Sequence, residues 1–350
     1  MNRVVESEGL TMAEALVEVT RGPLVESRHT GIVAVVDSGG RPAVSIGDVE
    51  RAIFARSAVK LIQALPLVES GAADRFGLEV AELAIAGASH NGEPAHCDTA
   101  RAMMAKAGLA PDALECGPQW PERMEDVLRL GCAGDQPTAL HNNCSGKHAG
   151  FLCLACRMGV DPAGYVEPEH PAQQAITATL SEMTETPLGP AVRGTDGCSI
   201  PTYAIPLVRV ARAFARLGTG EHLAPERARA AERLRAAAAA APFMVAGTGR
   251  FCTEVMQRFG ARAYVKTGAE GVFCAILPEA GLGVALKVDD GTTRASEALM
   301  AAILKRFVAR DDADRRFLDR WANRPLVNRR DRTVGTVRVA AAAEAAIAGG

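Results

Sequence analysis

The chain places strand-forming segments near both of its ends and helix-forming segments between them. The strand patterns cover residues 15–19, 32–36, 43–46, 271–277 and 284–288. Turn sequences predict a hairpin in each set, at Ser38-Gly39-Gly40 and at Glu279-Ala280-Gly281. The chain therefore opens on an antiparallel sheet and supplies further sheet strands late in the sequence.

Helical periodicity occupies much of the intervening chain. The expected helices cover residues 58–68, 149–158, 171–183, 205–217, 225–241 and 295–308, and a short strand at 334–339 precedes a frayed tail at 340–350. No linker is rich enough in Gly, Pro or Ser to separate two independent units. We expect a single elaborate domain over residues 1–350, with an α/β (α+β) fold in which helices pack on a mainly antiparallel central sheet.

Residues 141–150, His-Asn-Asn-Cys-Ser-Gly-Lys-His-Ala-Gly, combine amides, imidazoles, a thiol and an amine, a mixture that no folding role requires. Ser145-Gly146 predicts a turn and Ala149 lies in an apolar helix, so Cys144 lies where a loop becomes a helix. Backbone donors at a helix start favour anions and thiolates. The alternative is a helix cap beside an unrelated buried thiol.

Charge and hydropathy exclude several classes of function. The 39 basic and 41 acidic residues give a net charge of −2 without a basic block, so nucleic-acid binding is not expected. Residues 1–10 carry Arg3, Glu6 and Glu8 where a signal peptide needs an apolar core, and no apolar run is long enough for a membrane span. Nine scattered cysteines favour metal or catalytic roles over disulfides in a reducing compartment. We expect a soluble, cytoplasmic protein.

Only six of the 39 basic residues are lysines, and three of these occur in short motifs. Because lysine can lose its proton and arginine cannot, these lysines are candidates for proton transfer or metal binding. Ser57-x-x-Lys60 lies at a predicted helix start, where the spacing places hydroxyl and amine on one face. Lys147 lies in the central stretch, and Lys266 begins a Lys-Thr-Gly sequence in a late strand region.

The order of Ser57-x-x-Lys60, Ser89-x-Asn91 and Lys266-Thr267-Gly268 resembles penicillin-binding proteins and serine β-lactamases. Further motifs point to a more specific family. Together with residues 141–150, Arg56, Asp196-Gly197-Cys198, Gly247-Thr248-Gly249-Arg250 and residues 266–271, the chain resembles the rhizobial-type L-asparaginases, the asparaginase II family.

This resemblance implies a β-lactamase-like fold, a homodimer, and hydrolysis of L-asparagine to L-aspartate and ammonia. It makes Ser57 with Lys60 one Ser-Lys pair and Ser89 with Lys266 a second. It further implies a zinc ion (Zn²⁺) bound by Cys144, Lys147 and Cys198. It also implies that the substrate-binding residues, which lie beside the substrate and the metal, are Arg56, His148 and Asp196. The role of Asn91 stays open.

Two other functions fit the same residues. Zinc-bound water could be the nucleophile, with Ser57 only binding substrate. A non-catalytic protein that binds amino acids or peptidoglycan fragments is the alternative outside the enzymes. Cys153-x-x-Cys156 has the spacing of a zinc or redox motif, but it lies inside an apolar helix without a second such pair, which favours core packing.

Overall fold

The structure is a computed structural model that describes residues 14–349; residues 1–10, where no signal peptide is expected, lie outside this range. Its central sheet has five strands in the order β4-β3-β10-β9-β8, and each neighbouring pair is antiparallel. These strands are β3 (Gly31–Asp37), β4 (Pro42–Ile46), β8 (Tyr264–Thr267), β9 (Val272–Leu277) and β10 (Leu282–Val288). The predicted antiparallel sheet and both of its hairpins are confirmed.

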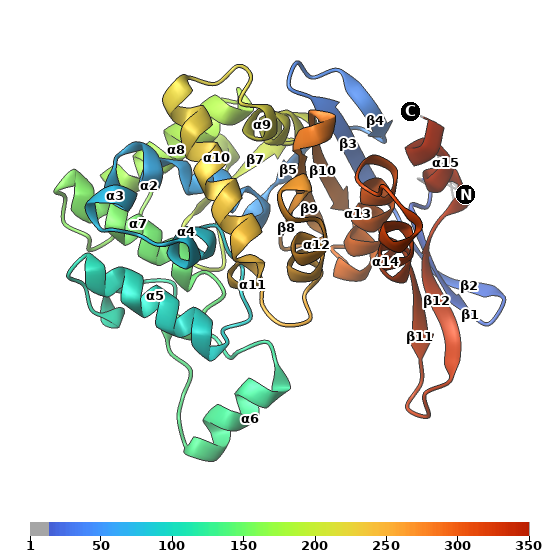
Figure 1. The fold of residues 1–350 in the computed structure, drawn as a ribbon, viewed down its shortest axis with the longest axis horizontal. Coiled ribbons are helices and arrows are strands. Elements are labelled where there is room, and N and C mark those ends of the chain that lie inside the picture. Colours follow the sequence, from blue (N-terminus) through green and yellow to red (C-terminus); the bar gives the residue numbers. More distant parts are fainter. Residues whose placement is uncertain (1–13, 350) are drawn as a thin grey trace, which may run out of the picture.

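The other elements surround this sheet (Figure 1). The remaining strands are β1 (Val17–Arg21), β2 (Leu24–His29), β5 (Ala52–Phe54), β6 (Arg193–Thr195), β7 (Pro201–Pro206), β11 (Asn323–Val327) and β12 (Thr333–Val339). The α-helices are α1 (Lys60–Gln63), α2 (Leu65–Glu69), α3 (Ala72–Arg75), α4 (Val80–Ala86), α5 (Pro94–Lys106), α6 (Met124–Ala133), α7 (Ser145–Met158), α8 (Pro171–Thr184), α9 (Leu207–Thr219), α10 (Pro225–Ala240), α11 (Pro242–Val245), α12 (Phe251–Phe259), α13 (Thr293–Phe307), α14 (Asp312–Ala322) and α15 (Ala341–Gly349).

Helices cover the central sheet, and the side chains of its strands are apolar because they face these helices and not solvent. All six residues of β9 are buried, so both faces of this strand are covered. Helices α9 and α13 both pack against β9 and β10. Most of the remaining helices gather beyond the β8 edge, and α6 stands away from them (Figure 1). The predicted mixed fold, with helices packed on an antiparallel sheet, is therefore confirmed.

Gly283 of β10 lets α9 approach the sheet closely. A Cβ atom at this position would lie 2.0 Å from the carbonyl oxygen of Ala211 and 2.2 Å from the backbone nitrogen of Ala215. We expect Gly283→Ala to lower the free energy of unfolding by roughly 3 kcal/mol or more, because backbone atoms must move. Thermal or denaturant unfolding measures this loss. Gly131→Ala in α6, where a Cβ meets no atom within 4 Å, is the matched control and should be neutral or stabilising.

Two smaller sheets contain β1 and β12, which the strand patterns predicted, and β2, β5, β6, β7 and β11, which they missed. One has the strand order β11-β12-β1-β2 and so joins the two ends of the described chain, and the other has the order β5-β7-β6. The predicted frayed tail is wrong, because α15 is a helix whose Ala343 and Ile347 side chains are buried. Its small apolar side chains pack on the fold, which local polarity alone did not indicate. Within the described residues, no helix combines the length and apolar character that a membrane crossing needs.

Candidate active site

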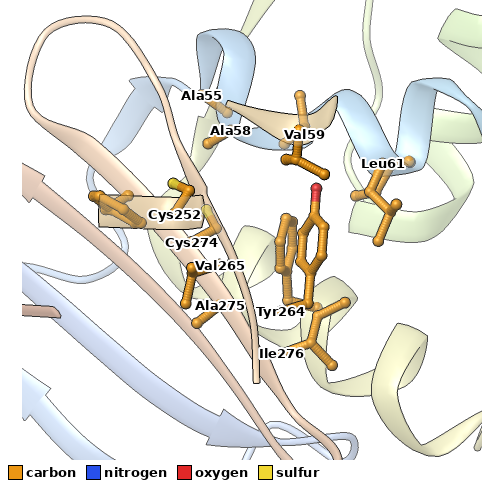
Figure 2. Packing of buried hydrophobic residues seen from close by; sticks show 14 of the residues in the cluster. Ala55, Ala58, Val59, Leu61, Cys252, Tyr264, Val265, Cys274, Ala275 and Ile276 are labelled. Carbon is orange, nitrogen blue, oxygen red and sulfur yellow. The ribbon is translucent and has the colours of Figure 1, made fainter. Parts of the chain in front are cut away.

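Ser57 lies in a single 3₁₀ turn, Arg56–Val59, which precedes the short helix α1. Figure 2 shows Ala55, Ala58 and Val59 beside side chains of β8 and β9, so the turn is seated on the edge of the central sheet. Gly268 of the Lys-Thr-Gly motif permits this seating. A Cβ on Gly268 would lie 3.0 Å from the carbonyl oxygen of Ala55.

The predicted helix from Ser57 is therefore shorter and more broken than expected, but it keeps Ser57 and Lys60 in one turn. The backbone N–H of Lys60 donates to the carbonyl oxygen of Ser57. Residues three apart eclipse each other in a 3₁₀ turn, so the two side chains leave the same side of it. Ser57 is partly exposed, and its hydroxyl makes no hydrogen bond to any of the residues 14–349.

Both predicted catalytic lysines converge on Ser89. Nζ of Lys60 and Nζ of Lys266 each donate to Ser89 Oγ at 2.8 Å. Lys60 also donates to the carbonyl oxygen of Ala88 at 2.6 Å, and Lys266 donates to that of Thr267 at 2.8 Å. Three of the four predicted catalytic residues thus form one hydrogen-bonded chain, with the Ser57 turn beside it.

Burial sets the charge of these lysines. Lys60 and Lys266 are each 1 % exposed. Burial lowers the pKa of Lys60, against an opposing contribution from the Cys144 thiol. Burial also places the pKa of Lys266 well below its ordinary value, and the neighbouring Lys60 lowers it further. The neutral amine that proton transfer requires is therefore accessible to both residues.

Backbone hydrogen bonds hold the Ser89 loop on both sides. The N–H groups of Ser89 and Asn91 donate to the carbonyl oxygens of Val245 and Ala246, and the N–H of His90 donates to that of Asn143. Neither Ser89 nor Asn91 caps α5, because Glu93 occupies its N-cap position.

The predicted metal ligands also come together. Cys144 is the N-cap residue of α7, and Lys147 lies in the first turn of that helix. Lys147 Nζ lies 3.0 Å from Cys198 Sγ, and Lys60 Nζ lies 3.1 Å from Cys144 Sγ. Cys144, Lys147 and Cys198 are all buried. Two thiols and an amine from distant segments therefore meet in the core beside the Ser89 chain.

The surroundings shift the pKa values of the two thiols in opposite directions. A hydrogen bond from Cys198 and the nearby Lys60 and Lys147 hold the pKa of Cys144 well below its usual range, although burial opposes this. The same shared hydrogen bond raises the pKa of Cys198. Burial alone would lower the pKa of Lys147, but the neighbouring Cys198 and Cys144 raise it. These shifts favour the thiolate at Cys144 over the thiolate at Cys198, and they favour the charged form of Lys147.

This donor set fits a zinc ion. Among residues 14–349, no three His, Cys, Asp or Glu side chains gather into a metal site, so zinc here needs the Lys147 amine with the two cysteine sulfurs. The thiolate of Cys144 is a ready ligand, and binding would displace protons from the other two groups. The Cys153-x-x-Cys156 pair packs in and beside the core, as expected. Cys153 is fully buried in α7, and Cys156 lies at the edge of the core.

The predicted substrate-binding residues border the same centre. Arg56 has a left-handed φ of 51° and donates to Asp196 Oδ1 from Nε at 3.1 Å and from Nη2 at 2.9 Å. Burial alone would raise the pKa of Asp196, but these hydrogen bonds from Arg56 lower it. His148 Nδ1 lies 2.6 Å from the hydroxyl of Tyr165, a buried contact that no sequence motif indicated. His148 Nε2 is buried without a hydrogen-bond partner in the described part of the chain.

Comparison with known proteins supports the family inferred from the motifs. The model of the L-asparaginase II family matches residues 17–339. No curated protein sequence matches the chain. A β-lactamase structure from Mycobacterium bovis aligns with 14 % identity and a TM-score of 0.39, covering 80 % of this chain and 95 % of its own. A second structure, described as a candidate β-lactamase from Bacteroides dorei, aligns with 13 % identity and a TM-score of 0.36, covering 74 % and 84 %.

Both TM-scores are low, so the fold assignment rests on the sheet and helices described above. The family assignment rests on the match to the family model, which spans all of the site residues. The resemblance to asparaginase II proteins is thereby confirmed, and it identifies an amidohydrolase type of enzyme. The chain belongs to the L-asparaginase II family.

Proposed function

We propose that the protein hydrolyses L-asparagine to L-aspartate and ammonia, with Ser57 as the nucleophile. The observation that carries this proposal is the buried chain Lys60–Ser89–Lys266, joined by two 2.8 Å hydrogen bonds beside the partly exposed Ser57. A hydroxyl held between two amines of lowered pKa can accept a proton from one and donate to the other. Ser89 is therefore suited to relay protons, whereas Ser57 is the hydroxyl that solvent and substrate can reach.

The proposed reaction has two stages. In the first, Ser57 Oγ attacks the side-chain amide carbon while neutral Lys60 takes its proton, and Ser89 with Lys266 delivers a proton to the departing ammonia. The C–N bond breaks and an aspartyl ester on Ser57 remains. In the second, water gives its proton to the same chain and attacks the ester, which releases aspartate and restores the Ser57 hydroxyl.

Cys144, Lys147 and Cys198 would hold the zinc ion that the family resemblance implies. Bound there, it would supply a positive charge that positions the substrate and the two loops carrying the cysteines. Arg56, His148 and Asp196 would border the substrate. The proton transfers proposed above use only Lys60, Ser89 and Lys266.

Zinc content tests the proposed ligands. Protein purified without chelators should contain about one zinc per chain, and Cys144→Ala should lose it, because a thiolate ligand is removed. If the ion is positional, Cys144→Ala should raise KM for L-asparagine more than it lowers kcat. Elemental analysis and steady-state kinetics measure both effects. Cys153→Ala, in the same helix, is the control and should retain zinc; metal-free native protein, or zinc lost from the Cys153 variant, would refute the assignment.

Two assays separate this function from its alternatives. Release of ammonia from L-asparagine distinguishes an enzyme from a binding protein. Hydroxylamine added to the reaction should yield aspartyl hydroxamate if an acyl-enzyme forms on Ser57. Hydrolysis without hydroxamate and without a trapped adduct favours zinc-bound water as the nucleophile. We also propose a cytoplasmic homodimer, on the resemblance to the family, and analytical ultracentrifugation would measure its mass.

A further inference from the structure

The proposed substrate carries an α-carboxylate, and most cations at the site are already engaged. Lys60 and Lys266 donate to Ser89, and their lowered pKa values disfavour a charge on either. Lys147 Nζ lies 3.0 Å from Cys198 Sγ and is taken up by the proposed zinc site. These three lysines therefore leave the substrate carboxylate without an obvious partner.

Arg56 is also engaged. Both of its contacts go to the carboxylate of Asp196, which is largely buried beside it, so the pair has no net charge. Binding a second carboxylate there would oppose the charge of Asp196. A further cation, Arg250, lies in the Gly247-Thr248-Gly249-Arg250 turn, a motif without a role in the proposed mechanism.

Arg250 is a partly exposed cation at the N-cap position of α12. Its Nη1 donates to Asn91 Oδ1 at 2.9 Å, which places the guanidinium beside the loop of Ser89. Among the described residues, no carboxylate oxygen lies within 4.0 Å of its nitrogens. Its charge also reaches Lys266, whose pKa is lowered first by burial and then by nearby cations that include Arg250.

A buried network fixes the guanidinium in this place. The Asn91 amide nitrogen donates to Glu93 Oε1 and to the carbonyl oxygen of Thr248, both at 3.1 Å, which turns the amide oxygen toward Arg250. Glu93 in turn accepts from the N–H of Thr248 at 2.8 Å and from its hydroxyl at 2.7 Å. At Gly247, with φ +110°, a Cβ would lie 2.5 Å from Glu93 Oε1, so glycine is required.

The open role of Asn91 is thereby explained as that of a positioning residue. Its oxygen accepts a hydrogen bond from Nη1 of Arg250, and the other N–H groups of the guanidinium donate to no acceptor within residues 14–349. A guanidinium with a fixed plane and unused donors matches the geometry of a carboxylate. We propose that Arg250 binds the α-carboxylate of the substrate and so selects amides of α-amino acids. This inference rests on the proposed asparaginase function.

The test compares L-asparagine with 3-aminopropanamide, which is asparagine without its α-carboxylate. In the native enzyme kcat/KM should favour L-asparagine by about 100-fold, the effect of a charge-assisted pair of hydrogen bonds. Arg250→Gln should raise KM for L-asparagine by a similar factor, leave kcat within severalfold, and change turnover of 3-aminopropanamide about threefold or less. Arg250→Lys should recover part of the lost affinity for L-asparagine, since lysine keeps the positive charge but lacks the paired N–H donors of the guanidinium.

Arg235→Gln is the matched control, because Arg235 is a half-buried arginine of α10 without an ion pair in the described structure. It should leave the preference unchanged. Equal losses on both substrates in Arg250→Gln would overturn the inference, as would a preserved preference. Calorimetry of L-aspartate binding tests Arg250 independently of turnover, and the affinity should weaken about 100-fold in Arg250→Gln. If the native protein releases no ammonia, the proposed function is refuted, but this binding measurement still tests the role of Arg250.

Discussion

Ser57→Ala is expected to lower kcat for L-asparagine by about 10⁴-fold or more, because the attacking oxygen is removed. Stability should change little, since the Ser57 side chain is partly exposed and makes no hydrogen bond within residues 14–349. Lys60→Ala should be similarly inactive, and the double variant should be no worse than either single one, because nucleophile and base act as a unit. Steady-state kinetics and thermal unfolding of the three variants measure this.

Lys60 is buried, so a variant of similar length is needed to separate chemistry from packing. Lys60→Met should also be inactive while unfolding closer to the native temperature than Lys60→Ala. Mass spectrometry of quenched reactions locates the acyl group, which should be found on Ser57 and be absent from Ser57→Ala. Near-normal turnover by Ser57→Ala, or an adduct on Ser89, would show that the wrong serine was assigned.

Lys266→Arg is expected to lose nearly as much activity as Lys266→Ala, on the order of 10³-fold. The proposed relay needs a side chain that can lose its proton, and arginine retains its charge at every accessible pH. Lys266→Met is the control for packing and should be as inactive as the other two. Recovery of turnover in the arginine variant alone would reduce Lys266 to an electrostatic contact with the substrate.

Lys60 gives an expected pH dependence. Burial lowers the pKa of Lys60, against an opposing contribution from the Cys144 thiol. The neutral form, which takes the Ser57 proton in the proposed reaction, therefore persists to lower pH than it would in an exposed lysine, and activity should fall as pH decreases through the shifted pKa. A profile of kcat against pH measures this acidic limb. If activity instead rose only near the ordinary lysine pKa, the neutral-amine mechanism would fail.

Local patterns predicted much of the fold and most of the candidate site. The hairpin between β3 and β4 and that between β9 and β10 follow from strand periodicity and turn residues, which act over a few neighbouring positions. The clustering of Cys144, Lys147 and Lys266 near one another was expected from motif order and the family resemblance. Helix starts at Pro171 and Pro225 were likewise predicted, because proline favours the first helical turn.

Other features depend on contacts between distant segments, which periodicity does not encode. Lys60 donates to Ser89, 29 residues away, although its sequence spacing pointed to Ser57, because the loop between Ala88 and Asn91 is held against Val245 and Ala246. The Glu93 network was not anticipated, since a lone acid after a Ser-x-Asn sequence carries no local signal of its buried partners.

The tail, α15, is a helix because Ile347 finds a buried position on the assembled fold, although the isolated sequence resembles a loose end. The sequence by itself determined most strands of the central sheet, the long helices and the residue types that could carry the chemistry. The tertiary structure decided which serine receives both lysines and where Arg250 lies, because hydrogen bonds and burial are fixed only when distant segments pack together.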